Sequence, residues 1–272
     1  MKTLRVNGYD MAFVERGTGV PLVLVHGTLS DCRNWTPQME PFGAHYRTIA
    51  VSLRHYWPER WDGEAGDFTA QQHIADVAAF ISALQAGPVH LLGLSRGGYI
   101  AFRVAQNFPD RVRSLTLAEP GGSLAPDLEE GLPPEAPPIA LGPLYAKAAD
   151  SIRRGEIDEG LAATIDVIVG RGGWSRTPED RRQRLRDNAR TLLGQFNEQR
   201  APYSRADAQA IRAPTLLLAG EWSPASFHRI LDGLETAIAN VRRVAIPLAS
   251  HGSNVDNPEA FNREVLAFLK DF

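Results

Sequence analysis

A serine flanked by glycines, in the segment GLSRG at residues 93–97, is the group in this sequence best suited to covalent chemistry. The apolar residues 89–94 have the character of a buried strand, and residues 98–107 have that of a helix. A sharp turn from strand to helix strains the serine and raises its hydroxyl above the sheet edge, where helix N–H groups favour an oxyanion. The pattern predicts that Ser95 attacks a carbonyl carbon, with an ordinary N-cap serine as the alternative.

The elements that would hold this serine follow a regular order along the chain. Short apolar or β-branched runs alternate with longer helical stretches, which is the pattern of crossover units on a mainly parallel sheet. The sequence therefore predicts an α/β fold in which about eight mostly parallel strands are flanked by helices. The expected strands are residues 4–6, 11–15, 21–25, 48–53, 89–94, 112–117, 215–219 and 241–247.

This alternation stops between residues 121 and 210. The segment opens with a Pro-rich, acidic stretch and continues with helical patterns near residues 145–154, 157–169 and 178–196. Leu161, Ile165 and Ile168 recur at helical spacing, which favours a folded insertion over a disordered linker. We expect a core formed by residues 1–120 and 211–272, with a helical cap at 121–210 inserted after the sixth strand.

Three turns give the sequence a resemblance to the α/β-hydrolase family, and in particular to its serine-nucleophile esterases and lactonases. The third strand runs into VHGT at residues 25–28, the fifth into the serine turn, and the eighth into ASHG at residues 249–252. The likeness covers both ends of the chain, whereas the insertion matches no pattern that we can name. The resemblance implies a triad in the chain order serine, acid, histidine, with no cofactor and no metal.

The resemblance also implies roles for residues near the serine. His251 is the expected general base, because it follows the last strand and an imidazole titrating near pH 6.5 can take and return a proton. The oxyanion hole would use the backbone N–H groups of Arg96, directly after the serine, and of Thr28, after the third strand. His26 is expected to order the same turn and is also a candidate substrate contact.

The acid is where this sequence departs from the family pattern. Similar hydrolases place Asp after the seventh strand in a Gly-Glu-x-Asp turn, and here Ser223 stands at that position in GEWSP, residues 220–224. Glu119 emerges at the carboxyl end of the sixth strand, where catalytic groups of α/β folds collect, and some hydrolases carry their acid there. We expect Glu119 to be the acid, with Glu221 or a dyad lacking a working acid as the alternatives.

Aromatic and basic residues crowd the loop after the fourth strand, SLRHYWPERW at residues 52–61. These side chains could line a substrate pocket, or they could pack and pair at the surface. Trp57 in this loop and Trp222 after the seventh strand are candidate substrate contacts, in addition to His26.

Composition restricts the partners of the chain. Its 272 residues carry 29 Lys and Arg against 32 Asp and Glu, a net charge of −3 that gives no indication of nucleic-acid binding. Cys32 is the single cysteine, so no intramolecular disulfide can form. Without a long apolar stretch, neither a signal peptide nor a membrane span is expected. We expect a cytoplasmic protein that acts on a small molecule and could form a homo-oligomer.

These features predict a serine hydrolase that cleaves a carboxylic ester or lactone through an acyl-enzyme on Ser95. One alternative is hydrolysis of a carbon–carbon bond in a ring-cleavage product by the same residues. Another is a ligand receptor with slow turnover, which the serine at position 223 favours.

Overall fold

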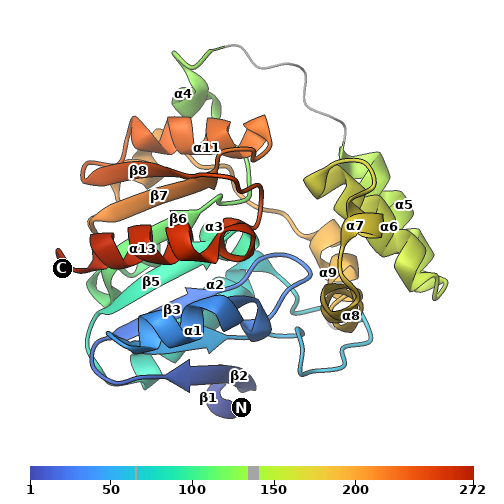
Figure 1. The fold of residues 1–272 in the computed structure, drawn as a ribbon, viewed down its shortest axis with the longest axis horizontal. Coiled ribbons are helices and arrows are strands. Elements are labelled where there is room, and N and C mark those ends of the chain that lie inside the picture. The colour runs from blue at the N-terminus through green and yellow to red at the C-terminus, as the bar shows by residue number, and fades with distance from the viewer. Residues whose placement is uncertain (65, 134–140) are drawn as a thin grey trace.

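The computed structural model describes residues 1–64, 66–133 and 141–272, and an eight-stranded sheet forms its centre (Figure 1). Strand order is β1-β2-β4-β3-β5-β6-β7-β8, in which β2 pairs antiparallel with β1 and β4 and the other pairs are parallel. The predicted mostly parallel sheet is therefore confirmed. The strands are β1 (Lys2–Val6), β2 (Tyr9–Arg16), β3 (Pro21–Val25), β4 (Arg47–Val51), β5 (Val89–Leu94), β6 (Val112–Ala118), β7 (Thr215–Gly220) and β8 (Val241–Ile246).

Helices cover both faces of this sheet. In Figure 1, α1 (Thr36–Gly43) and α13 (Pro258–Leu269) lie in front of it, and α2 (Ala70–Ala83) and α3 (Arg96–Asn107) lie behind. Every residue of β3 and of β5 is buried, which explains why these strands are apolar without a polar face. Alternate residues of β3 join two different cores: Val23 and Val25 one, Leu22 and Leu24 the other.

Local sequence signals set the ends of the outer helices. The Thr69 hydroxyl accepts from the Gln72 N–H at the start of α2, and the Asn257 side chain accepts from the Ala260 N–H at the start of α13. Pro258 occupies the first position of α13, where its missing N–H leaves no helical hydrogen bond unmade. The shorter elements are η1 (Cys32–Trp35), η2 (Pro109–Arg111), α11 (Ala225–Glu235) and α12 (Ser253–Asp256).

Between β6 and β7 the described chain is helical, which confirms the insertion after the sixth strand. Helices α5 to α9 lie beyond one end of the sheet (Figure 1). Division of the chain at residues 120 and 210 stays a prediction, and residues 134–140 of the predicted cap lie outside the described residues. The helices are α4 (Pro126–Glu129), α5 (Leu141–Arg153), α6 (Ile157–Val169), α7 (Gly173–Arg176), α8 (Glu179–Asp187), α9 (Thr191–Asn197) and α10 (Arg205–Gln209).

A single helix over residues 178–196 was the wrong prediction, because the chain turns between α8 and α9. The buried side chain of Asn188 lies in this turn, where its Nδ2 donates to Asp31 Oδ2 at 2.7 Å. Its Oδ1 accepts from the Trp57 N–H at 2.8 Å. These two contacts tie the turn to the sheet domain, and no periodicity of apolar residues could indicate them.

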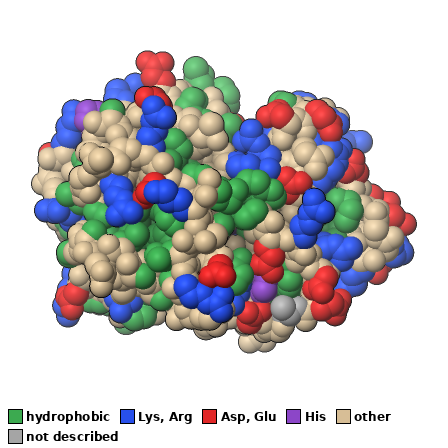
Figure 2. All heavy atoms as spheres, turned by 90° about the horizontal axis from the view of Figure 1, so that it is seen from below, with side chains coloured by type: hydrophobic (Ala, Val, Ile, Leu, Met, Phe, Trp, Pro, Cys, Tyr) green, Lys and Arg blue, Asp and Glu red, His purple; other side chains and the backbone are tan. Residues whose placement is uncertain are grey.

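The inserted helices share a small apolar core of their own. Leu161 and Ile165 of the expected stripe are buried in it, together with residues of α5 and α9. Leu29, from the turn after β3, packs into the same cluster and so joins the insertion to the sheet. Within the described ranges, no helix is long and apolar enough to cross a membrane. On the face shown in Figure 2, basic and acidic side chains are intermingled over both parts.

Candidate active site

Ser95 lies in the turn that connects β5 to α3. Its backbone has φ 54° and ψ −119°, a positive-φ conformation that costs a non-glycine residue free energy and is found mostly at functional sites. The strands beside it hold this turn: the Ser95 N–H donates to Ala118 O, and Ser95 O accepts from the Gly121 N–H, each at 2.9 Å. The predicted strained turn is thus present in the backbone.

The glycines on either side of Ser95 are required by space. A Cβ on Gly93 would lie 2.2 Å from Gly97 O, and a Cβ on Gly97 would lie 2.2 Å from Val25 O. Real Cβ atoms do not approach backbone that closely. Glycine at 93 therefore lets the turn close on itself, and glycine at 97 lets the end of β3 pack against it.

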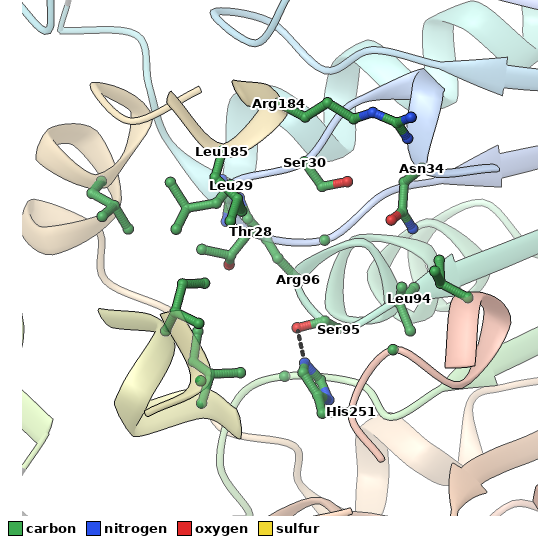
Figure 3. A pocket seen from close by; sticks show the side chains of 18 of the residues that line it. Thr28, Leu29, Ser30, Asn34, Leu94, Ser95, Arg96, Arg184, Leu185 and His251 are labelled. Atoms are coloured by element: carbon green, nitrogen blue, oxygen red, sulfur yellow. Dashed lines mark hydrogen bonds between the residues drawn. The ribbon is translucent and has the colours of Figure 1, made fainter. Parts of the chain in front are cut away.

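His251 follows β8 and faces the serine. Its Nε2 lies 3.1 Å from Ser95 Oγ. In Figure 3 the imidazole points toward this hydroxyl. The imidazole stacks on the Phe227 ring with centroids 3.9 Å apart. Asp256 of α12 accepts from the Ser250 N–H at 3.0 Å and so fixes the preceding residue. The two residues predicted to be nucleophile and base are therefore in contact.

Glu119 directly follows β6 and is fully buried with a φ of 47°. Its Oε2 lies 3.1 Å from His251 Nδ1, although the ring N–H does not form a well-directed hydrogen bond at this distance. The Gly220 N–H donates to Oε1 at 2.8 Å and the Gly252 N–H donates to Oε2 at 3.2 Å. The Ser223 hydroxyl also donates to Oε1. Ser223, at the position where the family pattern places an acid, is therefore a hydrogen-bond partner of Glu119.

This surrounding keeps Glu119 ionised. Burial raises the pKa of its carboxyl, but contact with His251 and hydrogen bonds from Ser223 and Gly220 more than offset burial, so the pKa lies below its usual value. The alternative acid, Glu221, is exposed, and its side chain accepts from the Leu248 N–H at 3.2 Å. Of the two candidate acids, the structure brings Glu119 to His251.

Thr28 and Arg96, expected to supply the oxyanion hole, both line the cavity beside Ser95 (Figure 3). In the part of the chain that the structure describes, neither backbone N–H has a hydrogen-bond acceptor. Arg96 opens α3, whose first N–H groups have no partner within the helix and carry partial positive charge. Two free donors thus lie where an oxyanion could be held.

Two residues at the end of α9 hold the side chains of these donors, and neither residue was predicted from the sequence. Gln195 Oε1 accepts from the Thr28 hydroxyl at 2.8 Å. Glu198 accepts from both terminal nitrogens of Arg96, at 2.6 and 2.7 Å, and both of these side chains are only 1% exposed. Residues 195 and 198 are one helical turn apart in an insertion that matches no known pattern, so only the folded chain reveals their partners.

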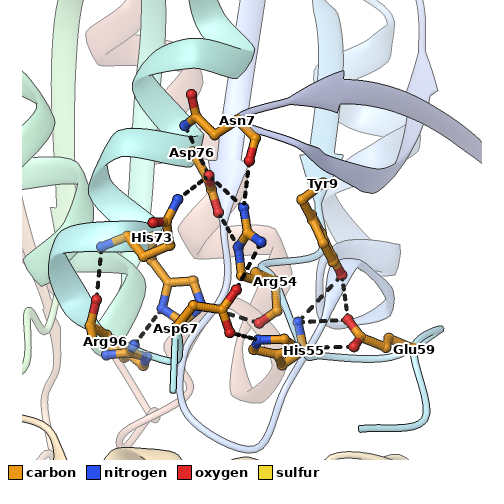
Figure 4. A network of polar contacts seen from close by, with 11 residues as sticks. Asn7, Tyr9, Arg54, His55, Glu59, Asp67, His73, Asp76 and Arg96 are labelled. Carbon is orange, nitrogen blue, oxygen red and sulfur yellow. Dashed lines mark hydrogen bonds and ion pairs between the residues drawn. The ribbon is translucent and has the colours of Figure 1, made fainter. Parts of the chain in front are cut away.

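The basic and aromatic loop after β4 forms a polar network and does not line the cavity (Figure 4). Arg54 pairs with Asp76 through Nε at 2.8 Å and Nη2 at 3.1 Å. His55 bridges Glu59 at 3.0 Å and Asp67 at 2.7 Å. Of the two interpretations open for this loop, packing and pairing is the one observed.

His73 connects this network to the serine turn. Its Nδ1 accepts from Arg96 Nη2 at 2.6 Å, and its Nε2 donates to Arg54 O at 3.1 Å (Figure 4). Burial and the neighbouring Arg96 charge hold the pKa of His73 well below its usual value, so the ring is a neutral connector. The Arg96 side chain, next to Ser95, is therefore fixed from both sides, by His73 and by the insertion.

None of the three expected substrate contacts lines the cavity, which corrects that expectation. His26 is fully buried, donates from Nδ1 to Gly27 O at 2.9 Å and accepts the Leu53 N–H at 3.0 Å. Burial lowers the pKa of His26 to about 4, so it orders the turn as a neutral ring. The Arg33 guanidinium carbon lies 3.8 Å above the centroid of the Trp57 ring, and Trp222 is 61% exposed at the surface.

The cavity above Ser95 has a volume of about 910 Å³ and lies between the sheet and the inserted helices. Its walls combine apolar side chains of both parts, including Leu29, Ile165 and Phe227, with arginines of α7 and α8. This size and composition suit a small organic ligand. Among the described residues, no group of three or more His, Cys, Asp or Glu side chains could hold a metal ion.

The fold agrees with comparisons to known proteins. Residues 20–258 match the family described as alpha/beta hydrolase fold, and the chain belongs to that family. A relative from Acinetobacter baylyi, (E)-2-((N-methylformamido)methylene)succinate hydrolase, is 23% identical over 99% of this chain and 98% of its own length.

Two solved structures are similar over nearly the whole chain. The enol-lactonase from Burkholderia xenovorans LB400 has a TM-score of 0.76 at 23% identity, with 98% of this chain and 99% of that one covered. A thermophilic esterase from Thermogutta terrifontis, solved with malate bound, has a TM-score of 0.74 at 25% identity, with 99% and 97% covered. The family contains hydrolases of esters and lactones that share this fold.

Proposed function

We propose that this protein is a serine hydrolase that cleaves a carboxylic ester or lactone of a small organic molecule. The observation that carries the proposal is the chain of contacts from Ser95 Oγ to His251 Nε2 and from His251 Nδ1 to Glu119, each 3.1 Å long, at the wall of the cavity. Nucleophile, base and orienting acid are the three groups that acyl transfer on serine requires.

In the proposed first half-reaction, His251 Nε2 accepts the Ser95 hydroxyl proton while Oγ attacks the carbonyl carbon. The carbonyl electron pair moves onto oxygen, and the N–H groups of Thr28 and Arg96 donate to that oxyanion. Collapse of the tetrahedral intermediate breaks the carbon–oxygen bond, and His251 returns its proton to the departing alkoxide. The products of this half-reaction are an acyl-enzyme and an alcohol, or, for a lactone, an acyl-enzyme whose acyl chain carries the hydroxyl group.

Water completes the reaction. His251 Nε2 takes a proton from water as its oxygen attacks the acyl carbon, and Ser95 Oγ leaves and regains that proton. In both halves the imidazole is transiently positive, and the ionised Glu119 beside Nδ1 stabilises this charge. A neutral hydroxyl at position 223 could not do this alone, and its bond to Glu119 supports a carboxylate that has moved to the end of β6.

The test is hydrolysis of a panel of 4-nitrophenyl esters and aliphatic lactones by wild type and by Ser95→Ala. We expect turnover by wild type, loss of turnover in the variant, and an acyl adduct on Ser95 in a rapid-quench mass spectrum. Turnover only of a ring-cleavage dienoate would instead favour carbon–carbon hydrolysis. Tight ligand binding without turnover would favour a receptor and contradict the proposal.

A further inference from the structure

One arginine of α8 lacks the partners that its neighbours have. Arg182 donates to Trp174 O at 3.1 Å, Arg184 donates to Arg33 O at 3.4 Å, and Arg186 pairs with Asp158 at 2.7 Å. Arg181 has no acceptor among the residues that the structure describes, although it is half-buried in the cavity wall. A cation that is partly removed from water and has no counter-ion is costly unless a ligand supplies one.

Arg181 lies beside the proposed reaction centre. A Cβ built on Gly252, the residue after His251, would be 3.5 Å from Arg181 Nη2. Arg184 lines the same cavity and extends from α8 over Ser30 and Asn34 (Figure 3). The wall of the cavity on the α8 side is therefore cationic close to the base.

The acidic residues of the cavity have other partners and leave the Arg181 charge uncompensated. Glu198 is held by Arg96, Asp31 is held by Arg33, and Asp256 accepts from the Ser250 N–H. Asp180 lies 3.5 Å from Arg184. None of these carboxylates forms an ion pair with Arg181 in the described part of the chain.

The far end of α8 is fixed to the sheet domain, so the position of the helix that carries Arg181 is set by the fold. Asp187 accepts from Arg33 Nη2 at 2.8 Å, and the adjacent Asn188 bonds to Asp31 and to the Trp57 backbone. These contacts hold the helix that carries the free guanidinium over the site.

We propose that Arg181 binds a carboxylate of the substrate, and that the substrate is therefore an ester or lactone that also carries a free carboxylate group. The guanidinium offers planar paired donors that match the two oxygens of a carboxylate, and burial in the cavity wall strengthens this interaction. That the bound molecule is a substrate rests on the proposed function. The anion-binding site itself rests on the geometry alone.

The test compares two esters of equal chain length, mono(4-nitrophenyl) glutarate and 4-nitrophenyl valerate, which differ by a terminal carboxylate in place of a methyl group. We expect the ratio of kcat/KM for the acidic ester to that for the neutral ester to fall about tenfold or more in Arg181→Gln, as for loss of a hydrogen bond to a charged group. Arg181→Lys, which keeps the charge without the planar fork, should retain part of the ratio. Arg263→Gln removes an exposed arginine on α13 and should keep the wild-type ratio.

An unchanged ratio in Arg181→Gln would overturn the carboxylate subsite while leaving the hydrolase proposal intact. If neither ester is hydrolysed by wild type, the proposed function fails and calorimetric titration with glutarate decides the subsite. About tenfold weaker glutarate binding by Arg181→Gln than by wild type would support it. Equal binding by the two proteins, or no binding by wild type, would overturn it.

Discussion

At the scale of single residues, Glu119 follows β6, one strand away from the position after β7 where the family pattern places the triad acid. The turn after β7 still contacts this carboxylate, because the Ser223 hydroxyl and the Gly220 N–H both donate to Glu119 Oε1. Carboxyl ends of neighbouring parallel strands meet at one edge of a sheet, so a side chain after β6 can reach the histidine that a side chain after β7 would otherwise contact. A glutamate has the extra carbon for that distance.

Position along the chain, together with the resemblance to α/β-hydrolases, predicted Ser95, His251 and Glu119, because each follows a strand whose apolar run is clear in the sequence. The structure brings these three together. The sequence could not show that Ser223 is a hydrogen-bond partner of the acid, since a neutral residue at that position looks like a loss. Aromatic character also misled us at Trp57 and Trp222, because a ring that packs or lies exposed has the same sequence signature as one that binds substrate.

His55 provides a residue-scale prediction about pH. Burial lowers the pKa of His55, but the contacts with Glu59 and Asp67 raise it by more, so the folded pKa lies above the usual value. A raised histidine pKa stabilises the fold fully below the unfolded value of about 6.5, and this contribution is lost as pH rises through the folded value.

Replacement of His55 by Asn, which tolerates the φ of 71° at this position, should therefore destabilise the protein more at low pH. We expect a loss of about 1 kcal/mol in free energy of unfolding at pH 6 and a smaller loss at pH 9, measured by urea titration. The exposed His45, replaced in the same way, is the matched control. A loss that grows with pH would contradict the assignment of charge to His55.

At the scale of elements, the end of α9 supports the turn after β3 and the start of α3 at the same time. Gln195 holds the Thr28 side chain and Glu198 holds that of Arg96, so one helix of the insertion positions both proposed oxyanion donors. Hydrogen bonds across 167 and 102 residues of sequence leave no local pattern by which they could have been predicted.

Removal of the Gln195 amide should therefore lower turnover more than it weakens substrate binding. We expect Gln195→Ala to reduce kcat about tenfold, less than the 10²- to 10³-fold effect of losing an oxyanion donor outright, with a smaller change in KM. Gln183→Ala, on the exposed side of α8, is the control. Equal kcat values for Gln195→Ala and wild type would show that Thr28 is positioned without α9.

At the scale of the whole molecule, the sheet could be predicted from the sequence, whereas the contacts that hold the insertion against the sheet could not. Strands β3 and β5 are buried on both faces, so their apolar runs mark them without ambiguity. The insertion is joined to the sheet by Leu29 in its core and by Asp31, whose carboxylate contacts Arg33 and Asn188. Polar contacts between distant segments leave no periodic pattern in the sequence. The break between α8 and α9 could therefore not be predicted from the sequence.

Asp31 should therefore control how firmly the insertion is held. Burial raises the pKa of its carboxyl, but hydrogen bonds from Arg33 and Asn188 lower it below the usual value. The folded state therefore stabilises the ionised carboxylate. We expect Asp31→Ala to accelerate amide hydrogen exchange about tenfold or more in α8 and α9, with β5 unchanged, as for loss of one charged hydrogen bond. The control is Asp110→Ala, whose side chain is 96% exposed. Equal protection of α8 in Asp31→Ala and wild type would contradict this anchoring role.

The most direct test of the central claim, that Ser95 is activated through His251 by a carboxylate at Glu119, is the rate of covalent labelling by a fluorophosphonate, followed by intact-protein mass spectrometry. The account predicts one adduct on wild type, none on Ser95→Ala, and labelling of Glu119→Gln slowed by about 10² to 10⁴. Glu221→Gln, which removes the exposed alternative carboxylate, should label at the wild-type rate. Labelling of Glu119→Gln at the wild-type rate, or a wild-type protein that resists the reagent, would contradict it.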